Sequence, residues 1–120
     1  MAEFWAQRKV LVTGGNGFLG RVVVQQLNDL GAEVVAPTHD EYDLVIPGAA
    51  SEMLATHRPS HLIHLAARVG GIGYNQVEPA ALYLDNLLMG THVIEAARTH
   101  GVEKTVLLGT VCSYPKFTPV

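Results

Sequence analysis

A short apolar run passes into a glycine-rich turn in the stretch that decides the fold, Val10-Leu11-Val12-Thr13-Gly14-Gly15-Asn16-Gly17-Phe18-Leu19-Gly20. The three opening residues are typical of a strand buried on both faces of a parallel sheet. Apolar residues then recur at helical spacing, at Leu19, Val22, Val23, Leu27 and Leu30. The glycines therefore lie where a strand passes into a helix.

The glycines of this turn fit two spacings found in dinucleotide-binding folds. Gly15, Gly17 and Gly20 form G-x-G-x-x-G, whereas Gly14, Gly17 and Gly20 form the wider T-G-x-x-G-x-x-G. Glycine lets the backbone turn tightly and approach the phosphates, and the helix N-terminus offers N–H groups and a positive dipole end to the anion. An ordinary βα turn accounts for one glycine rather than four in seven residues, so we predict nucleotide binding.

The composition is that of one globular domain. The chain has 120 residues, of which 48% are hydrophobic and 16% charged, and its net charge is −3. It contains no basic run, so we expect no nucleic-acid partner, and no apolar run long enough to span a membrane. The single Cys112 excludes an internal disulfide and fits a reducing cytoplasm. The six histidines form no metal-ligand pattern, so we expect no metal site.

Strand and helix patterns alternate along the chain. The pattern predicts strands over residues 9–13, 33–36, 41–45, 61–66 and 104–108, and helices over residues 18–30, 51–57 and 79–100. Such alternation implies right-handed crossovers between parallel strands. We therefore expect an α/β fold with a Rossmann-like, doubly wound parallel sheet of strand order 3-2-1-4-5.

The residues after the second strand bear on the choice of cofactor. A dinucleotide fold reads the adenosine ribose there, with an acidic residue for NAD or an arginine for the 2′-phosphate of NADP. Here the chain reads Ala36-Pro37-Thr38-His39-Asp40. Asp40 comes a few residues late and no arginine is present, so both cofactors stay open. Asp43 and Leu44 are candidates for the adenine side, although a solvated turn carboxylate explains Asp43 equally well.

The chain resembles the extended short-chain dehydrogenase/reductases, the NAD-dependent epimerase/dehydratase family, over essentially its whole length. Residues 13–20 resemble the nucleotide loop of that family, and His64-Leu65-Ala66-Ala67 resembles its motif after the fourth strand. A narrower similarity, to the GDP-L-fucose synthase branch, rests on residues 68–73, Asn86, Met89 and Gly109-Thr110-Val111-Cys112-Ser113-Tyr114-Pro115-Lys116. It implies an NADPH-dependent epimerase/reductase of GDP-4-keto-6-deoxymannose. Another nucleotide-sugar epimerase or dehydratase, or a non-catalytic nucleotide-binding module, remains the alternative.

The resemblance assigns roles position by position. It places the cofactor against Gly14, Asn16, Gly17, Phe18, Leu19, Gly20, Asp43, Leu44, Leu65, Ala66 and Ala67. It places the nucleotide sugar near Val69, Gly70, Gly71, Ile72 and Lys116. Thr110 falls at the catalytic Ser/Thr position, and Cys112 at the cysteine proposed to move a proton during epimerisation. On the residues alone, a strand-end threonine is usually a satisfied hydroxyl and a lone cysteine a small buried hydrophobe.

The chain departs from the family in two respects. None of Tyr42, Tyr74, Tyr83 and Tyr114 has a lysine four residues later, so the Tyr-x-x-x-Lys pair that handles the substrate proton is missing. NADPH-using relatives also carry arginines about where Thr38 and Asp40 stand. We therefore expect residues 1–120 to be a truncated N-terminal NAD(P)-binding domain without the substrate domain. We also expect its last strand to be an exposed edge that favours self-association, whereas the intact enzyme would be a homodimer paired through long helices, including residues 79–100.

Overall fold

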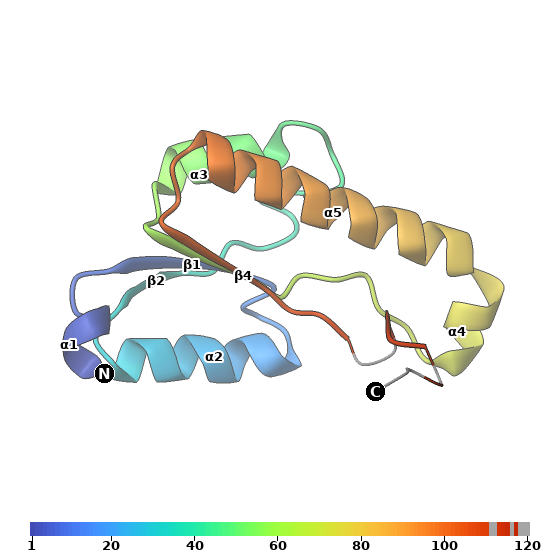
Figure 1. Cartoon of the computed structure of the whole chain (residues 1–120), viewed down its shortest axis with the longest axis horizontal. Helices are drawn as coiled ribbons and strands as arrows, with labels where there is room; N and C mark the ends of the chain where they lie inside the picture. The colour runs from blue at the N-terminus through green and yellow to red at the C-terminus, as the bar shows by residue number, and fades with distance from the viewer. Residues whose placement is uncertain (111–112, 116, 118–120) are drawn as a thin grey trace.

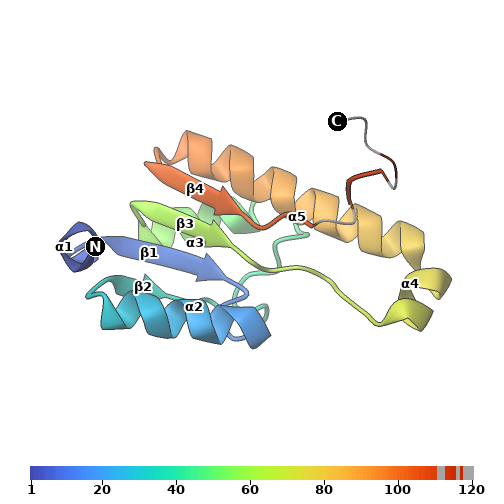
Figure 2. The same ribbon diagram turned by 60° about the horizontal axis from the view of Figure 1, so that its bottom comes forward.

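Four parallel strands form one sheet in the computed structural model, which describes residues 1–110, 113–115 and 117. The strands are β1 (Lys9–Thr13), β2 (Glu33–Val35), β3 (His61–His64) and β4 (Lys104–Leu107), in the order β2-β1-β3-β4. Leu11 of β1 lies opposite Val35 on one side and Leu62 on the other. The carboxyl ends of all four strands point to one edge (Figure 2). The predicted α/β, Rossmann-like architecture is confirmed.

The strand predicted over residues 41–45 is not formed, and that prediction was wrong. The Asp43 side chain accepts a hydrogen bond from the Val45 N–H at 3.1 Å, and the Asp43 carbonyl accepts one from the Ile46 N–H at 2.9 Å. These local bonds use backbone and side-chain groups that a strand would need for its ladder. The segment is therefore a loop between β2 and the next helix, and the remaining strands keep the predicted order.

Helices cover both faces of the sheet (Figure 1). α2 (Phe18–Asp29) lies on one face, and α3 (Ala49–His57) and α5 (Pro79–Thr99) lie on the other. These three helices begin and end within two residues of the predicted bounds. Two further helices, α1 (Ala2–Trp5) and α4 (Ile72–Val77), are too short to show an apolar period and were not predicted.

The core has two parts because the sheet is buried on both faces. Alternate side chains of β1 serve each part: Leu11 faces α3 and α5, whereas Val10 and Val12 face α2. The larger part is completed by Leu44, Ala50, Met53, Leu54, Leu62, Met89, Val93, Ala96 and Ala97. Leu27 of α2 is the buried residue that closes the smaller part. Burial on both faces explains why the strands read as continuous apolar runs.

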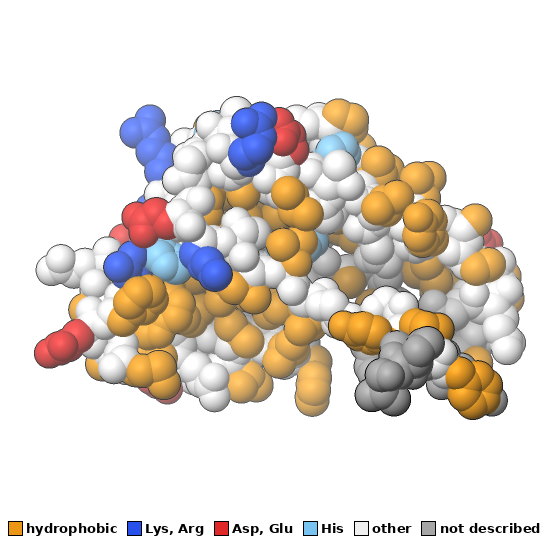
Figure 3. Space-filling model, in the orientation of Figure 1, with side chains coloured by type: hydrophobic (Ala, Val, Ile, Leu, Met, Phe, Trp, Pro, Cys, Tyr) orange, Lys and Arg blue, Asp and Glu red, His pale blue; other side chains and the backbone are white. Residues whose placement is uncertain are grey.

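β4 is one of the two edge strands of the sheet, as expected. Val106, Leu107 and Leu108 are 48%, 42% and 61% exposed, although they continue the apolar pattern of β3. Apolar side chains extend across the face on which β4 lies (Figure 3). Among the described residues, no helix is both long and apolar enough to cross a membrane.

Candidate functional site

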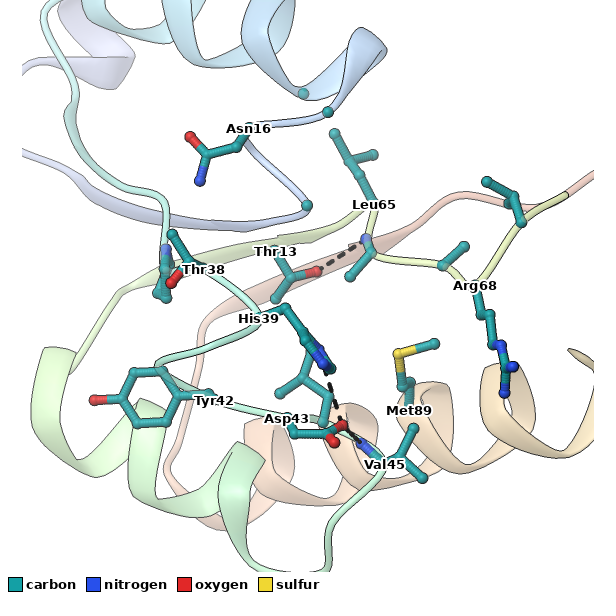
Figure 4. A pocket seen from close by; sticks show the side chains of 18 of the residues that line it. Thr13, Asn16, Thr38, His39, Tyr42, Asp43, Val45, Leu65, Arg68 and Met89 are labelled. Atoms are coloured by element: carbon teal, nitrogen blue, oxygen red, sulfur yellow. Dashed lines mark hydrogen bonds and ion pairs between the residues drawn. The ribbon is translucent and has the colours of Figure 1, made fainter. Parts of the chain in front are cut away.

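A cavity of about 850 Å³ lies at the carboxyl ends of β1 and β3. Its walls come from the glycine loop after β1, the loop after β2, the segment after β3, and the helices α3 and α5 (Figure 4). This is the edge of an open α/β sheet, beside the strand where chain order reverses, at which ligands bind. We therefore build the site around this cavity.

The glycine loop is packed too closely for any side chain. Gly14 has φ +70°, and a Cβ added to it would lie 2.7 Å from the backbone nitrogen of Ala66. A Cβ on Gly20 would lie 2.1 Å from the carbonyl oxygen of Gly14, so the first turn of α2 rests directly on the end of β1. Gly14, Gly17 and Gly20 line the cavity, whereas Gly15 packs beneath Ala36. The wider T-G-x-x-G-x-x-G spacing is therefore the one that describes the loop.

The N-terminus of α2 points its first turn at the cavity. Its N-cap is Gly17, and no side chain caps the helix. The first-turn N–H groups, from Phe18, Leu19 and Gly20, therefore keep their donor capacity at a wall that these residues line. Free N–H groups and the positive end of the helix dipole favour a bound anion such as a pyrophosphate.

A buried polar network supports the floor of the cavity. The Thr13 hydroxyl accepts a hydrogen bond from the Ala66 N–H at 3.2 Å and lies 2.7 Å from His64 Nδ1. Thr13 and His64 are almost fully buried, and this burial lowers the pKa of His64. The ring is therefore neutral, and the hydroxyl can donate its proton to Nδ1 while accepting from Ala66. The network holds the backbone after β3 against the backbone after β1.

Hydrogen bonds hold the loop after β2 near both of its ends. The Glu41 carboxylate accepts hydrogen bonds from the Thr38 N–H at 2.7 Å and the Thr38 hydroxyl at 2.9 Å. Because of these bonds, first the backbone one and then the hydroxyl, the pKa of Glu41 is lowered. Further along, His92 of α5 donates from Nδ1 to the Leu44 carbonyl at 2.9 Å. Thr38 and Leu44 both line the cavity, so these bonds shape its wall.

The segment after β3 is clamped to α5. The Asn86 side chain accepts from the Arg68 N–H at 2.8 Å and donates to the Arg68 carbonyl at 2.9 Å. The Arg68 guanidinium pairs with Asp85 and donates to the Tyr74 hydroxyl at 2.7 Å. Arg68 and Asp85 line the cavity as a neutralised pair.

The structure brings all eleven residues predicted for the cofactor to this one cavity. Of the residues predicted for the sugar nucleotide, Val69 lines the cavity, whereas Gly70, Gly71 and Ile72 form the turn into α4. Thr110 follows β4 and is exposed, and its carbonyl accepts a hydrogen bond from the Ser113 hydroxyl at 2.7 Å. Cys112 and Lys116 lie outside the described residues.

Sequence reasoning missed the side chains that shape the walls, among them Arg68, Asp85, Glu41 and His92. Arg68, Asp85 and His92 make contacts with residues far away in the sequence, and Glu41 makes contacts across a loop. No sequence motif predicts such contacts. No group of three or more His, Cys, Asp or Glu side chains gathers as a metal site within the part of the chain that the structure describes.

Residues 10–120 match the sequence model of the NAD dependent epimerase/dehydratase family. The chain belongs to this family. It is 42% identical over 112 residues to a putative GDP-L-fucose synthase 2 of Arabidopsis thaliana, a match that covers 92% of this chain and 34% of that protein. The chain thus spans about a third of the length of the curated relatives it matches.

Two solved structures of this kind are similar over most of the chain. A GDP-mannoheptose C4 reductase from Campylobacter jejuni with NADP bound has a TM-score of 0.87 and 25% identity, and the match covers 94% of this chain and 36% of that one. A Thermus thermophilus UDP-glucose 4-epimerase in complex with NAD has a TM-score of 0.72 and 30% identity, with 81% and 36% covered. This chain therefore has the same fold as the matching part of these two enzymes.

Replacing Gly20 by alanine should destabilise the fold and open the glycine loop. The added Cβ would meet the Gly14 carbonyl, and because both partners are backbone we expect a loss of about 3 kcal/mol in the free energy of unfolding. Gly90→Ala is the matched control. Gly90 lies inside α5 with nothing near its Cβ position, so we expect a gain of about 1 kcal/mol there. Denaturant unfolding measures the stability of both variants. A Gly20→Ala variant as stable as the wild type would contradict the close packing of Gly20 on Gly14.

Replacing Thr13 by valine should show how much the hydrogen bonds of Thr13 with Ala66 and His64 contribute to the free energy of unfolding. Valine keeps the shape but leaves the Ala66 N–H and His64 Nδ1 without their hydroxyl partner, which should cost about 3 kcal/mol. Thr13→Ser keeps the hydroxyl and should cost about 1 kcal/mol for the lost methyl group. Amide hydrogen exchange at Ala66 should accelerate in the valine variant alone. Equal exchange in both variants would count against the network.

Stability should fall in mild acid partly because of His64. Burial lowers its pKa in the folded chain, so the unfolded chain binds the proton more readily. The contribution is therefore complete above the unfolded pKa of about 6.5 and is lost as the pH falls below it. His64→Asn, which keeps an acceptor for Thr13, should show a smaller loss between about pH 7.5 and 5.5. The pKa of His61 is also lowered, so a slope remains in both proteins; identical slopes would refute the assignment to His64.

Proposed function

We propose that this chain is the NAD(P)-binding part of a GDP-L-fucose synthase-like epimerase/reductase that acts on GDP-4-keto-6-deoxymannose. The observation that carries the proposal is the convergence of the eleven predicted cofactor residues on one cavity at the carboxyl edge of the sheet. Kinship with GDP-L-fucose synthases supports the substrate class. The cofactor is NAD or NADP, as bound in the two similar structures.

The residues present fit a dinucleotide. Gly14, Gly17 and Gly20 leave the backbone bare where phosphates must approach it, and the uncapped start of α2 supplies donors for them. Asp43 and Leu44 would lie on the adenine side, and Leu65, Ala66 and Ala67 would line the ribose nearer the reacting ring. The bond from the Ala66 N–H to the Thr13 hydroxyl anchors one of these walls, and the bond from His92 to the Leu44 carbonyl anchors the other.

The bound dinucleotide supplies the hydride acceptor or donor for C4 of the keto-sugar. Thr110 would donate a hydrogen bond from its hydroxyl to the sugar oxygen that gains or loses carbonyl character. Cys112 would move a proton at the carbon next to the carbonyl during epimerisation. Val69, Gly70, Gly71, Ile72 and Lys116 would hold the nucleotide sugar. Residues 1–120 would thus form the N-terminal domain of an enzyme whose substrate domain belongs to a longer chain.

The intact enzyme would be a cytoplasmic homodimer that pairs through α5. This helix exposes a row of large apolar side chains, with Tyr83 70%, Leu84 52%, Leu87 50% and Ile94 51% exposed. Burying such a row against a second copy is the usual way to remove it from water.

A second candidate is nucleotide binding without turnover. It is favoured by one observation: among the described residues, the lining of the cavity includes Tyr42 but no lysine to pair with it. Another nucleotide-sugar epimerase or dehydratase is the enzyme alternative, and the residues Cys112 and Lys116 of the GDP-L-fucose synthase pattern argue against it. Incubating the chain with GDP-4-keto-6-deoxymannose and NADPH tests for turnover, because oxidation of NADPH by these 120 residues would exclude the non-catalytic form.

Titration with NADH and NADPH tests the proposal. A ligand that binds only the folded chain should raise the free energy of unfolding by about 2.7 kcal/mol at a hundredfold excess over Kd. Calorimetry on the same samples should give saturable heats with one site per chain. Gly20→Ala should lose both signals, whereas Gly90→Ala should keep them. Failure of a folded wild-type chain to bind either dinucleotide would overturn the proposed function.

A further inference from the structure

The loop after β2 has few hydrogen bonds to distant parts of the chain. Within the residues that the structure describes, most hydrogen bonds of residues 38–46 join groups no more than four positions apart in the sequence. Two bonds reach further. The Tyr42 hydroxyl lies 3.5 Å from His57 Nε2, at the limit of a hydrogen bond, whereas His92 Nδ1 donates to the Leu44 carbonyl at 2.9 Å. The bond from His92 is therefore the stronger connection between this loop and a distant helix.

The bond from His92 acts at the point where the loop meets both the core and the cavity. Leu44 is 5% exposed and belongs to the larger part of the core together with Met89 of α5. Packing holds the side chain of Leu44, and His92 holds its carbonyl. Asp43 and Val45, the residues on either side of Leu44, line the cavity (Figure 4). The way in which these two residues face the cavity therefore depends on α5.

The same helix also holds another wall of the cavity. Asn86 bonds to both the N–H and the carbonyl of Arg68 and so fixes the segment after β3. Asn86 precedes His92 by six positions, which corresponds to about 9 Å along the helix axis. Met89 lies between them in the sequence and lines the cavity itself. The anchors of two walls therefore lie on one continuous helix, which sets their separation.

We propose that His92 is a positioning residue for the dinucleotide, because it fixes the wall on the adenine side to α5 through the Leu44 carbonyl. The inference rests on the proposed function, since it concerns the same cavity. Without this bond the loop would keep its local hydrogen bonds, but fewer chains would hold it in the position that binds. The apparent Kd rises in proportion as the competent fraction falls. The net effect of one hydrogen bond corresponds to about fivefold in such an equilibrium.

The bond also requires one particular tautomer of His92. A carbonyl oxygen only accepts, so the His92 ring must carry its proton on Nδ1. His64 is the opposite case, because its Nδ1 accepts from the Thr13 hydroxyl and its proton is then on Nε2. Nitrogen-15 NMR of the wild-type imidazoles at about pH 8 distinguishes the two tautomers. We expect Nδ1–H at His92 and Nε2–H at His64, and an Nε2–H tautomer at His92 would overturn the proposal.

Calorimetric titration of the full 120-residue chain with ADP, NADH and NADPH tests the role in binding. His92→Leu removes the donor and should raise the Kd for ADP and for the dinucleotides alike, by about fivefold. His92→Asn should keep the wild-type values, because its amide nitrogen is bonded to Cγ just as Nδ1 is. Thr91→Ala is the matched control. The Thr91 hydroxyl donates to the Leu87 carbonyl at 2.8 Å within α5, and its loss should leave every Kd unchanged.

Asn86→Ala separates the two walls. It frees the backbone of Arg68 but leaves the bond from His92 to Leu44 in place. ADP contains only the adenine half of the ligand, so its Kd should stay unchanged while the Kd for NADH and NADPH rises. A general loss of packing around α5 would instead weaken ADP and the dinucleotides equally in both Asn86→Ala and His92→Leu.

The outcomes separate the two levels of inference. If His92→Leu binds ADP as tightly as the wild type, the positioning role is overturned while the proposed function stands. If His92→Asn binds as weakly as His92→Leu, a donor at the Nδ1 position is not what matters, and the role is again overturned. If a folded wild-type chain binds neither ADP nor a dinucleotide, the proposed function fails and the positioning role with it. The tautomer measurement uses the wild-type chain, so it tests the proposal even where a variant does not fold.

Discussion

The direct contact between the first turn of α2 and the end of β1 is the constraint on which the site depends. Gly20 rests on the Gly14 carbonyl at a distance that excludes any side chain, and Gly14 in turn faces the Ala66 backbone. Three backbone segments therefore meet without side chains between them. This contact directs the N-terminus of α2 towards the cavity and positions the backbone of Gly14 and Ala66 in its wall. Because the partners are all main chain, no neighbouring side chain can move to relieve a substitution there.

The walls of the cavity are loops, and each loop is held by a side chain anchored in a regular element. His92 of α5 holds the carbonyl of Leu44, Asn86 of α5 holds both backbone groups of Arg68, and Thr13 of β1 holds the Ala66 N–H. Loops are ordinarily the mobile part of a domain. Here their backbone groups are satisfied by residues whose own positions are set by core packing. The loops are therefore held in place before a ligand binds, which reduces the entropy cost of ordering them on binding.

Periodicity predicted the large elements well, because burial on both faces leaves a strong apolar record in β1, β3 and α5. It failed where few residues contribute. The run Tyr42-Asp43-Leu44-Val45 reads as a strand, yet Asp43 turns the backbone and Leu44 enters the core from a loop. The four residues of α1 and six of α4 are shorter than two helical turns. The choice between the two glycine spacings needed the contacts of Gly15 and Gly20, because both spacings share the same letters. The cavity residues taken from the family resemblance were brought together by the fold, whereas Glu41 and His92 carry no motif.

The separation between backbone packing and edge charge explains how one fold can serve either dinucleotide. The glycine loop presents main chain to the cavity, and altering it would disturb the packing of α2 on the sheet. The residues from Thr38 to Asp43 are mostly exposed and bond chiefly to one another. Charge can therefore change at this edge with little effect on the core, since exposed substitutions generally cost little.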